Sequence, residues 1–263
     1  MARARVCDIH TSMTQNNMTQ TVLITGAATR IGCVLAKGLA KDGWRVVIHY
    51  NKSKDAAAAL ANEIGQSSDI QPAIVQADLT NQDDVENLVE NAVQAIGTPL
   101  SALINNASTY NPDTANDYSP DDFDNHLDVN LKAPLRLAHQ FAAQMPKGES
   151  GKTGCIINMI DQRVLRPTPS FFTYGVSKSA LFAATKTMAQ SFAPHIRVNA
   201  VGPGPTIQSI YQDDAEFAQE AARTLLGAGS PPETILGAVR YLLSADAVTG
   251  QMIAVDGGQH LGF

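Results

Sequence analysis

Short apolar runs that alternate with helical patterns constrain this chain of 263 residues more than any other feature. Strand-like runs occupy 21–25, 45–50, part of 70–79, 100–107, 154–160, 196–204 and 251–258. Helical spacing of apolar residues covers 30–43, 54–65, 82–97, 120–146, 173–193 and 232–244. Strands that are apolar throughout and lead into helices are typical of a parallel sheet covered on both faces. The sequence therefore predicts an α/β fold, a doubly wound sheet of seven parallel strands.

The pattern runs through the chain without a linker, a repeat or a low-complexity block, so we expect one domain over residues 20–263. The first residues, 1–19, are polar and are predicted to form a flexible arm. Residues 205–230 lack regular periodicity and are rich in small residues. Long irregular segments of this kind are often lids over a binding site, which is the prediction for 205–230.

Composition excludes several classes of partner. The formal charge of −6 and the pI of about 5.4 argue against nucleic acid and anionic membranes. No apolar run approaches the roughly 18 residues that a membrane span needs. The three cysteines form no CxxC pair, and His49, His126, His139 and His195 show no ligand spacing, so neither disulfides nor a metal are expected. These features predict a cytoplasmic protein that acts on a small molecule.

The stretch VLITGAATRIG, residues 22–32, predicts a strand, a glycine turn and the start of a helix. Gly26 permits a tight turn, Gly32 permits close packing of helix on strand, and the amides at the helix N-terminus can bind a pyrophosphate. Arg30 stands where many such turns carry glycine. It is either a solvated first-turn arginine or a cation held over a phosphate-rich cofactor.

The end of the second strand, HYNKS, distinguishes between the nicotinamide cofactors. An NAD site would place Asp or Glu there to accept from the ribose 2′-hydroxyl, whereas Asn51, Lys52 and Ser53 are donors that suit a 2′-phosphate. NADPH is therefore the predicted cofactor. The residues predicted to bind it are Gly26, Arg30, Ile31, Gly32, Tyr50, Asn51, Lys52, Ser53, Asp78, Leu79, Asn106, Ala107, Ser108, Tyr174, Lys178, Pro203 and Gly204.

Tyr174 and Lys178 are spaced i and i+4, so they share one helix face. A phenol with its ordinary pKa of about 10 is a slow acid–base group near neutral pH, and a neighbouring ammonium lowers that pKa. Asn130 could hold a water molecule against the lysine. Asp161, which directly follows the strand 154–160, would raise the tyrosine pKa if it stays ionised, and the two groups could also share a proton and titrate as a pair.

These motifs together resemble the short-chain dehydrogenase/reductase family over nearly all of residues 20–260. The matching pieces are TGAATRIG, NNAS, Asn130, YGVSK, RVNAVGPG and the terminal VDGG. The resemblance implies a Rossmann-type reductase that uses Asn, Ser, Tyr and Lys, of which three map onto Asn130, Tyr174 and Lys178. It also implies a homotetramer, with the helices at 120–146 and 173–193 and the last strand at the interfaces.

The fourth catalytic position, usually serine, is Asp161 in this chain. An ionised aspartate cannot donate to a carbonyl oxygen and would repel a developing oxyanion. The pteridine-reductase branch of the family carries this substitution, and it is also similar in TGAATRIG with Arg30, in HYNKS, and in an aromatic residue after NNAS, here Tyr110. Dihydromonapterin reductases are similar in the C-terminal half, including QHL after VDGG.

This resemblance implies reduction of a C=N bond in a pterin, which yields an amine and needs no support for an oxyanion. The predicted catalytic residues are Asp161, Tyr174, Lys178 and Asn130, and the predicted substrate contacts are Ser108, Tyr110, Asp161 and Tyr174. Arg163 and Arg166 are interpreted as solvated loop charges more readily than as substrate clamps. Two alternatives stay open: a carbonyl or 3-oxoacyl reductase in which a protonated Asp161 is the donor, and an NADPH-binding protein without catalysis.

Overall fold

The computed structural model describes residues 20–67, 70–145 and 154–262. Its centre is a parallel sheet with strand order β3-β2-β1-β4-β5-β6-β7. The strands are β1 (Thr21–Ile24), β2 (Arg45–Tyr50), β3 (Ala73–Gln76), β4 (Ala102–Asn105), β5 (Gly154–Met159), β6 (Ile196–Pro203) and β7 (Met252–Val255). The predicted doubly wound sheet is confirmed. The predicted N-terminal arm, residues 1–19, lies outside the described residues.

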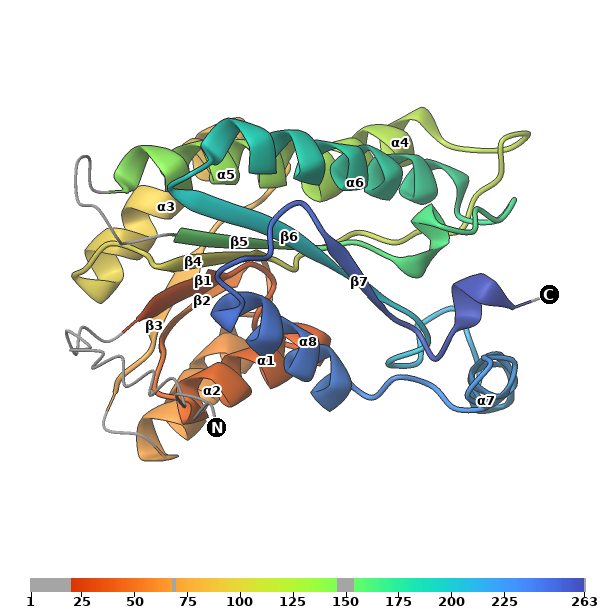
Figure 1. Ribbon diagram of the computed structural model, residues 1–263, viewed down its shortest axis with the longest axis horizontal. Coiled ribbons are helices and arrows are strands. Elements are labelled where there is room, and N and C mark those ends of the chain that lie inside the picture. Colours follow the sequence, from red (N-terminus) through yellow and green to blue (C-terminus); the bar gives the residue numbers. More distant parts are fainter. Residues whose placement is uncertain (1–19, 68–69, 146–153, 263) are drawn as a thin grey trace, which may run out of the picture.

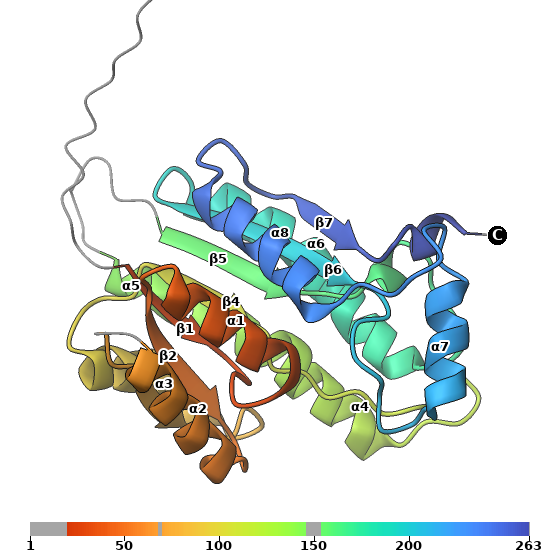
Figure 2. The same ribbon diagram turned by 90° about the horizontal axis from the view of Figure 1, so that it is seen from below.

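Helices cover both faces of the sheet (Figure 1). One face carries α1 (Arg30–Lys41), α2 (Lys54–Ser67) and α8 (Pro232–Ser244), which lie nearest the viewer in Figure 2. The other carries α3 (Gln82–Ile96), α4 (Pro120–Leu127), α5 (Ala133–Gln144) and α6 (Phe172–Phe192). Successive strand residues point to opposite faces, so Val22 and Ile24 join one apolar core while Leu23 joins the other.

The long helix predicted over 120–146 is interrupted by a π-helical turn. The turn, η1 (Asp128–Lys132), joins α4 to α5 and ends just before Pro134, where the sequence suggested a perturbation. It contains Asn130, whose side chain is fully buried. Single π-helical turns within α-helices occur frequently at functional sites because they turn a side chain away from the regular helical spacing.

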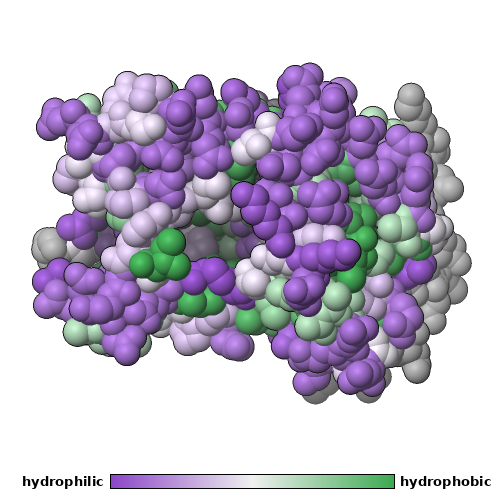
Figure 3. Space-filling view, turned by 180° about the vertical axis from the view of Figure 1, so that it is seen from behind, coloured by the Kyte–Doolittle hydropathy of each residue, from purple (hydrophilic) through white to green (hydrophobic). Residues whose placement is uncertain are grey.

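The direction of strand order reverses at β1, which pairs with β2 on one side and with β4 on the other. In open parallel sheets, ligands bind beyond the carboxyl ends of the strands at this reversal. Figure 3 shows a hollow in a largely hydrophilic surface, toward the end of the molecule that carries α7 (Asp214–Ala222). Among the described residues, no helix combines the length and apolar character needed to cross a membrane.

The irregular segment 205–230 contains the helix α7, which the sequence analysis did not predict. Asp213 and Glu216 form a reciprocal capping box at its start, and this Asp-x-x-Glu pattern was the available signal. None of the residues of α7 is buried, and its apolar face consists mostly of alanines with Phe217, a weak signal over nine residues. α7 stands beyond the carboxyl ends of β6 and β7, the place expected of a lid (Figure 1).

Candidate active site

The glycine turn after β1 adopts a conformation that its sequence requires. Gly26 has φ +61°, and a Cβ added at Gly32 would lie 2.3 Å from the Gly26 carbonyl oxygen. Arg30 also lies in the left-handed region, with φ +54°, which explains why this position commonly carries glycine. The N-cap of α1, Thr29, makes no side-chain cap hydrogen bond. Its uncapped first turn can therefore offer N–H groups to an anion.

His49, at the end of β2, fixes this turn and was not identified from the sequence. The Gly26 N–H donates to His49 Nδ1 at 3.0 Å, so the proton of the neutral ring is on Nε2, which donates to the Ala77 carbonyl oxygen at 3.1 Å. Burial lowers the pKa of His49 to about 4, which keeps the ring neutral at physiological pH. The only signal in the sequence was a histidine in an otherwise apolar strand.

Two neighbouring cavities are lined by all of the residues that the sequence predicts to contact the cofactor or the substrate. The larger, of about 740 Å³, follows the carboxyl ends of β1 to β4 and is lined by the predicted cofactor residues from Gly26 to Ser108. The smaller, of about 260 Å³, is lined by Tyr174, Lys178, Pro203 and Gly204. The first volume is within the range of small-molecule and cofactor sites, about 300–1,000 Å³.

Arg30 lines both cavities, and its exposed guanidinium donates to the backbone of the segment that follows β6. Nη1 donates to the Gln208 carbonyl oxygen and Nη2 to the Ile207 carbonyl oxygen, each at 3.1 Å. The side chain therefore connects the glycine turn to the start of the segment 205–230, which is predicted to be a lid. Whether it also contacts a phosphate remains a prediction.

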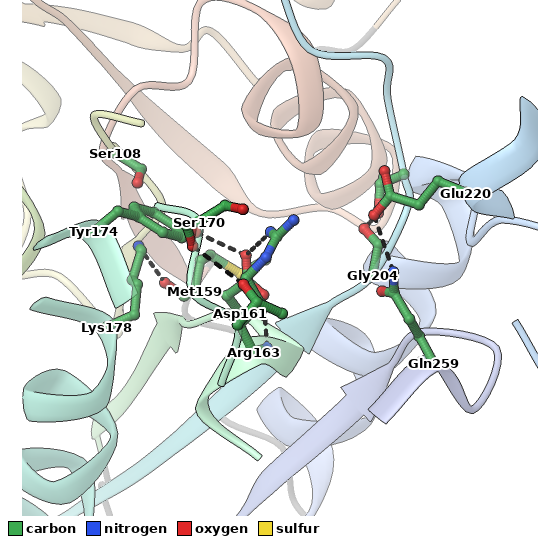
Figure 4. Close-up of polar contacts among 12 residues, drawn as sticks. Ser108, Met159, Asp161, Arg163, Ser170, Tyr174, Lys178, Gly204, Glu220 and Gln259 are labelled. Atoms are coloured by element: carbon green, nitrogen blue, oxygen red, sulfur yellow. Dashed lines mark hydrogen bonds and ion pairs between the residues drawn. The ribbon is translucent and has the colours of Figure 1, made fainter. Parts of the chain in front are cut away.

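The predicted phenol–carboxylate pair is present in the smaller cavity. Tyr174 OH donates to Asp161 Oδ2 at 2.9 Å (Figure 4). Lys178 Nζ lies 5.8 Å from the Tyr174 ring centroid and donates to the Met159 carbonyl oxygen at 2.9 Å. Burial, reinforced by Asp161, raises the pKa of Tyr174 well above its ordinary value, while burial lowers the pKa of Lys178 to about 8. The expected lowering of the Tyr174 pKa by the ammonium is thus outweighed.

Arg163 is paired with Asp161, so its interpretation as a solvated charge is wrong. The Arg163 backbone N–H donates to Asp161 Oδ1 at 2.7 Å, and Nη1 donates to Oδ2 at 3.3 Å. The side chain of Arg163 is 20% exposed and that of Asp161 is 13% exposed. Asp161 also caps the short helix η2 (Gln162–Val164), so it both starts this helix and contacts the tyrosine. With Tyr174 OH, its carboxylate accepts hydrogen bonds from three donors.

Asn130 supports the loop after β4. Its Oδ1 accepts from Ser108 Oγ at 3.1 Å and from the Thr109 N–H at 2.9 Å, while Nδ2 donates to the Thr109 carbonyl oxygen and to Ser177 Oγ. These contacts engage both ends of the amide. A water held between Asn130 and Lys178 remains a prediction.

Tyr110 stacks on Phe171, with ring centroids 4.1 Å apart and planes 11° apart, and it meets Tyr174 edge-on at 4.8 Å. The Arg163 guanidinium lies 5.7 Å and 5.4 Å from the centroids of Tyr110 and Phe171. Burial raises the pKa of Tyr110 to about 12. One face of Tyr110 is thus covered by Phe171, and only the opposite face could stack on a substrate.

The segment predicted to be a lid contributes a carboxylate that the sequence analysis did not select. Glu220 of α7 accepts from Gln259 Nε2 at 2.9 Å and from Gln212 Nε2 at 2.6 Å. Gln259 belongs to the C-terminal helix η3 (Gln259–Leu261), so Glu220 connects the lid to the end of the chain. Figure 4 shows this pair facing the group formed by Asp161, Arg163 and Tyr174, and all five residues line the smaller cavity.

Comparisons with known proteins agree with this geometry. Residues 26–260 match the family described as enoyl-(acyl carrier protein) reductase. Dehydrogenase/reductase SDR family member 4 of Homo sapiens is 31% identical over 90% of this chain and 86% of its own, and the 3-oxoacyl-[acyl-carrier-protein] reductase FabG of Staphylococcus epidermidis is 29% identical over 93% and 100%. The crystal structure of FolM alternative dihydrofolate reductase 1 from Brucella suis with NADP superposes with a TM-score of 0.88 at 41% identity, covering 93% of this chain and 96% of that one.

Proposed function

Because the chain belongs to the short-chain dehydrogenase/reductase family, we propose that it is an NADPH-dependent reductase that adds hydrogen across a C=N bond of a pterin. The observation that carries this proposal is the hydrogen bond from Tyr174 OH to Asp161 Oδ2, at a position where an oxyanion would meet a carboxylate. The similarity to a dihydrofolate reductase of the same fold supports a reduced nitrogen heterocycle as the product.

The larger cavity fits the proposed cofactor. The closely packed glycine turn and the uncapped start of α1 suit a pyrophosphate, and Asn51, Lys52 and Ser53 suit a 2′-phosphate. Lys178 would hold the nicotinamide ribose. When bound, NADPH supplies the hydride that is added to the carbon of the C=N bond.

Tyr174 supplies the proton that the nitrogen requires. Adding hydride to carbon breaks the C=N π bond and leaves negative charge on the nitrogen, which is basic enough to take a proton from a phenol of raised pKa. The N–H bond forms as the phenolic O–H bond breaks, and solvent then restores the phenol. The transient phenolate lies beside Asp161, and the positive charges of Lys178 and Arg163 offset this repulsion.

Asp161 supports the choice of substrate because it is an acceptor in this site. Its oxygens accept hydrogen bonds from the Tyr174 hydroxyl and from the backbone N–H and guanidinium of Arg163. A ketone would develop negative charge on oxygen, which needs donors and is repelled by a carboxylate. The 29% identity to a 3-oxoacyl reductase keeps carbonyl reduction as the second candidate, in which Asp161 would have to be protonated.

The predicted homotetramer stays a prediction based on family resemblance. Sedimentation of the purified chain tests it directly.

The test of the proposed function is NADPH oxidation by the purified enzyme with 7,8-dihydropterins, dihydrofolate and ketones. We expect dihydropterins to be reduced with a higher kcat/KM than any ketone. Asp161→Ser should lose dihydropterin reduction by about 10²-fold or more, in the range of a disrupted acid–base partner, and should gain ketone reduction. Turnover of ketones alone by the wild-type enzyme would select the second candidate, and unchanged dihydropterin turnover in Asp161→Ser would disprove the role of the carboxylate.

A further inference from the structure

We propose that Arg163 is a positioning residue that holds Asp161 as a carboxylate and thereby restricts the site to C=N bonds. This inference rests on the proposed function and extends it, because it assigns the selection of bond type to a residue that is not one of the proton donors.

The geometry fixes Arg163 against Asp161 at two points. The Arg163 backbone N–H donates to Oδ1 at 2.7 Å, and Nη1 donates to Oδ2 at 3.3 Å. The guanidinium is also held over Tyr110 and Phe171, at 5.7 Å and 5.4 Å from their centroids. The guanidinium packs beside the stacked rings of Tyr110 and Phe171, and partial desolvation strengthens its attraction to the Asp161 carboxylate.

Other charged groups near Asp161 do not take this role. Lys178 attracts Asp161 electrostatically but makes no ion-pair contact with it, since its ammonium donates to the Met159 carbonyl oxygen, and Tyr174 and Tyr110 are neutral phenols. Glu220, on the facing lid helix, is an acid. Within the residues that the structure describes, Arg163 is therefore the cation that forms an ion pair with Asp161.

Removal of the guanidinium would change what Asp161 can do. A largely buried carboxylate without its cation is unfavourable, and the simplest relief is to bind a proton. The resulting carboxylic acid has an O–H that can donate, as a serine hydroxyl can. A developing oxyanion would then meet a donor in place of a negative charge. Arg163 thus determines whether Asp161 accepts a hydrogen bond from the substrate or donates one to it.

The first experiment needs no substrate. Urea denaturation midpoints of wild type, Arg163→Gln and the control Arg166→Gln are compared at neutral and mildly acidic pH. Arg166 is an exposed arginine of the same loop whose Nη1 donates to the Gln259 carbonyl oxygen. We expect Arg163→Gln to lower the midpoint at neutral pH and to lose much of this deficit on acidification, because protonation of Asp161 removes the unpaired charge. In an Asp161→Asn background this pH dependence should disappear.

The second experiment measures bond selection. The ratio of kcat/KM for a ketone to kcat/KM for a dihydropterin should rise by about tenfold or more in Arg163→Gln, since one donor to an oxyanion changes rates by about 10²–10³-fold. The lower limb of the pH–rate profile for dihydropterin should move to higher pH. Arg163→Lys, which keeps a cation, should restore both properties in part, and Arg166→Gln should alter neither.

The two experiments separate the possible failures. A wild-type enzyme that reduces no dihydropterin disproves the proposed function, while the denaturation series still decides whether Arg163 holds the carboxylate. A deficit of Arg163→Gln that is the same at both pH values overturns the inference. So does an unchanged ratio of ketone to dihydropterin reduction in a folded Arg163→Gln enzyme that retains dihydropterin activity.

Discussion

Lys178 should make the cofactor-free enzyme less stable, and the size of this cost follows from its burial. The side chain is 2% exposed, and burial lowers the pKa of its ammonium from 10.5 to about 8. This difference corresponds to about 3 kcal/mol, at about 1.4 kcal/mol per pH unit. Since the folded-state pKa of a base lies below its unfolded value, the cost is fully present below about pH 8 and is relieved as the pH rises toward 10.5.

Replacing Lys178 by Met should therefore stabilise the apoenzyme at neutral pH while reducing its activity. Methionine removes the cost of about 3 kcal/mol but leaves the Met159 carbonyl oxygen without its donor, which costs about 1–3 kcal/mol. The net gain at pH 7 is then about 0–2 kcal/mol. The pH dependence is the sharper test, because the lost hydrogen bond contributes equally at each pH. By linkage the cost falls to about 2 kcal/mol at pH 9.

The assay is urea denaturation of the apoenzyme at pH 7 and pH 9, with Lys186→Met as the matched control. Lys186 lies on the same helix, is exposed, and extends over the Phe182 ring at 4.5 Å. We expect the stability of Lys178→Met relative to wild type to decrease by about 1 kcal/mol between these pH values, and that of Lys186→Met to stay constant. An identical difference at both pH values for Lys178→Met would refute the idea that a destabilised ammonium is buried beside Tyr174.

Three further predictions address the two cavities. Tyr174→Phe should reduce dihydropterin turnover by about 10²–10⁴-fold, while NADPH affinity, measured by fluorescence titration, stays near wild type. Lys52→Asp should raise kcat/KM with NADH relative to NADPH by about tenfold or more, because a carboxylate accepts from a 2′-hydroxyl and repels a 2′-phosphate. Glu220→Gln should improve kcat/KM for the anionic dihydrofolate relative to a neutral dihydropterin, as the lid carboxylate repels anions; an unchanged ratio would contradict this.

The fold and the cofactor cavity were predictable because both follow from local periodicity and from one topological rule. Apolar strands with intervening helices determine a parallel sheet, and the carboxyl ends of its first strands gather the predicted residues. Tyr174 and Lys178 share a helix face because helical spacing requires it. Asp161 reaches Tyr174 because β5 and α6 are neighbours in the fold, which the family resemblance implied.

The contacts that the sequence did not reveal depend on loop conformation. Arg163 is only two positions beyond Asp161, and charged loop residues at this spacing usually point to solvent. Here η2 turns the side chain back onto the carboxylate and over two aromatic rings. Glu220 escaped notice because α7 is short and has only a weak apolar face of alanines and Phe217, and its contact with Gln259 joins segments that are far apart in the sequence. No periodicity encodes either contact.

In the proposed reaction, the arrangement of charges in the smaller cavity would let the buried phenol act although its pKa is raised. Tyr174 keeps its proton at rest because burial and Asp161 both oppose ionisation. Lys178 remains charged below about pH 8 at a cost to stability, and Arg163 compensates Asp161. Proton transfer therefore becomes favourable only when a strongly basic nitrogen forms beside the phenol, at which point two nearby cations stabilise the phenolate. Under the proposed function, such a site would suppress loss of the proton before hydride addition, and its selectivity for nitrogen over oxygen would depend on keeping Asp161 negative.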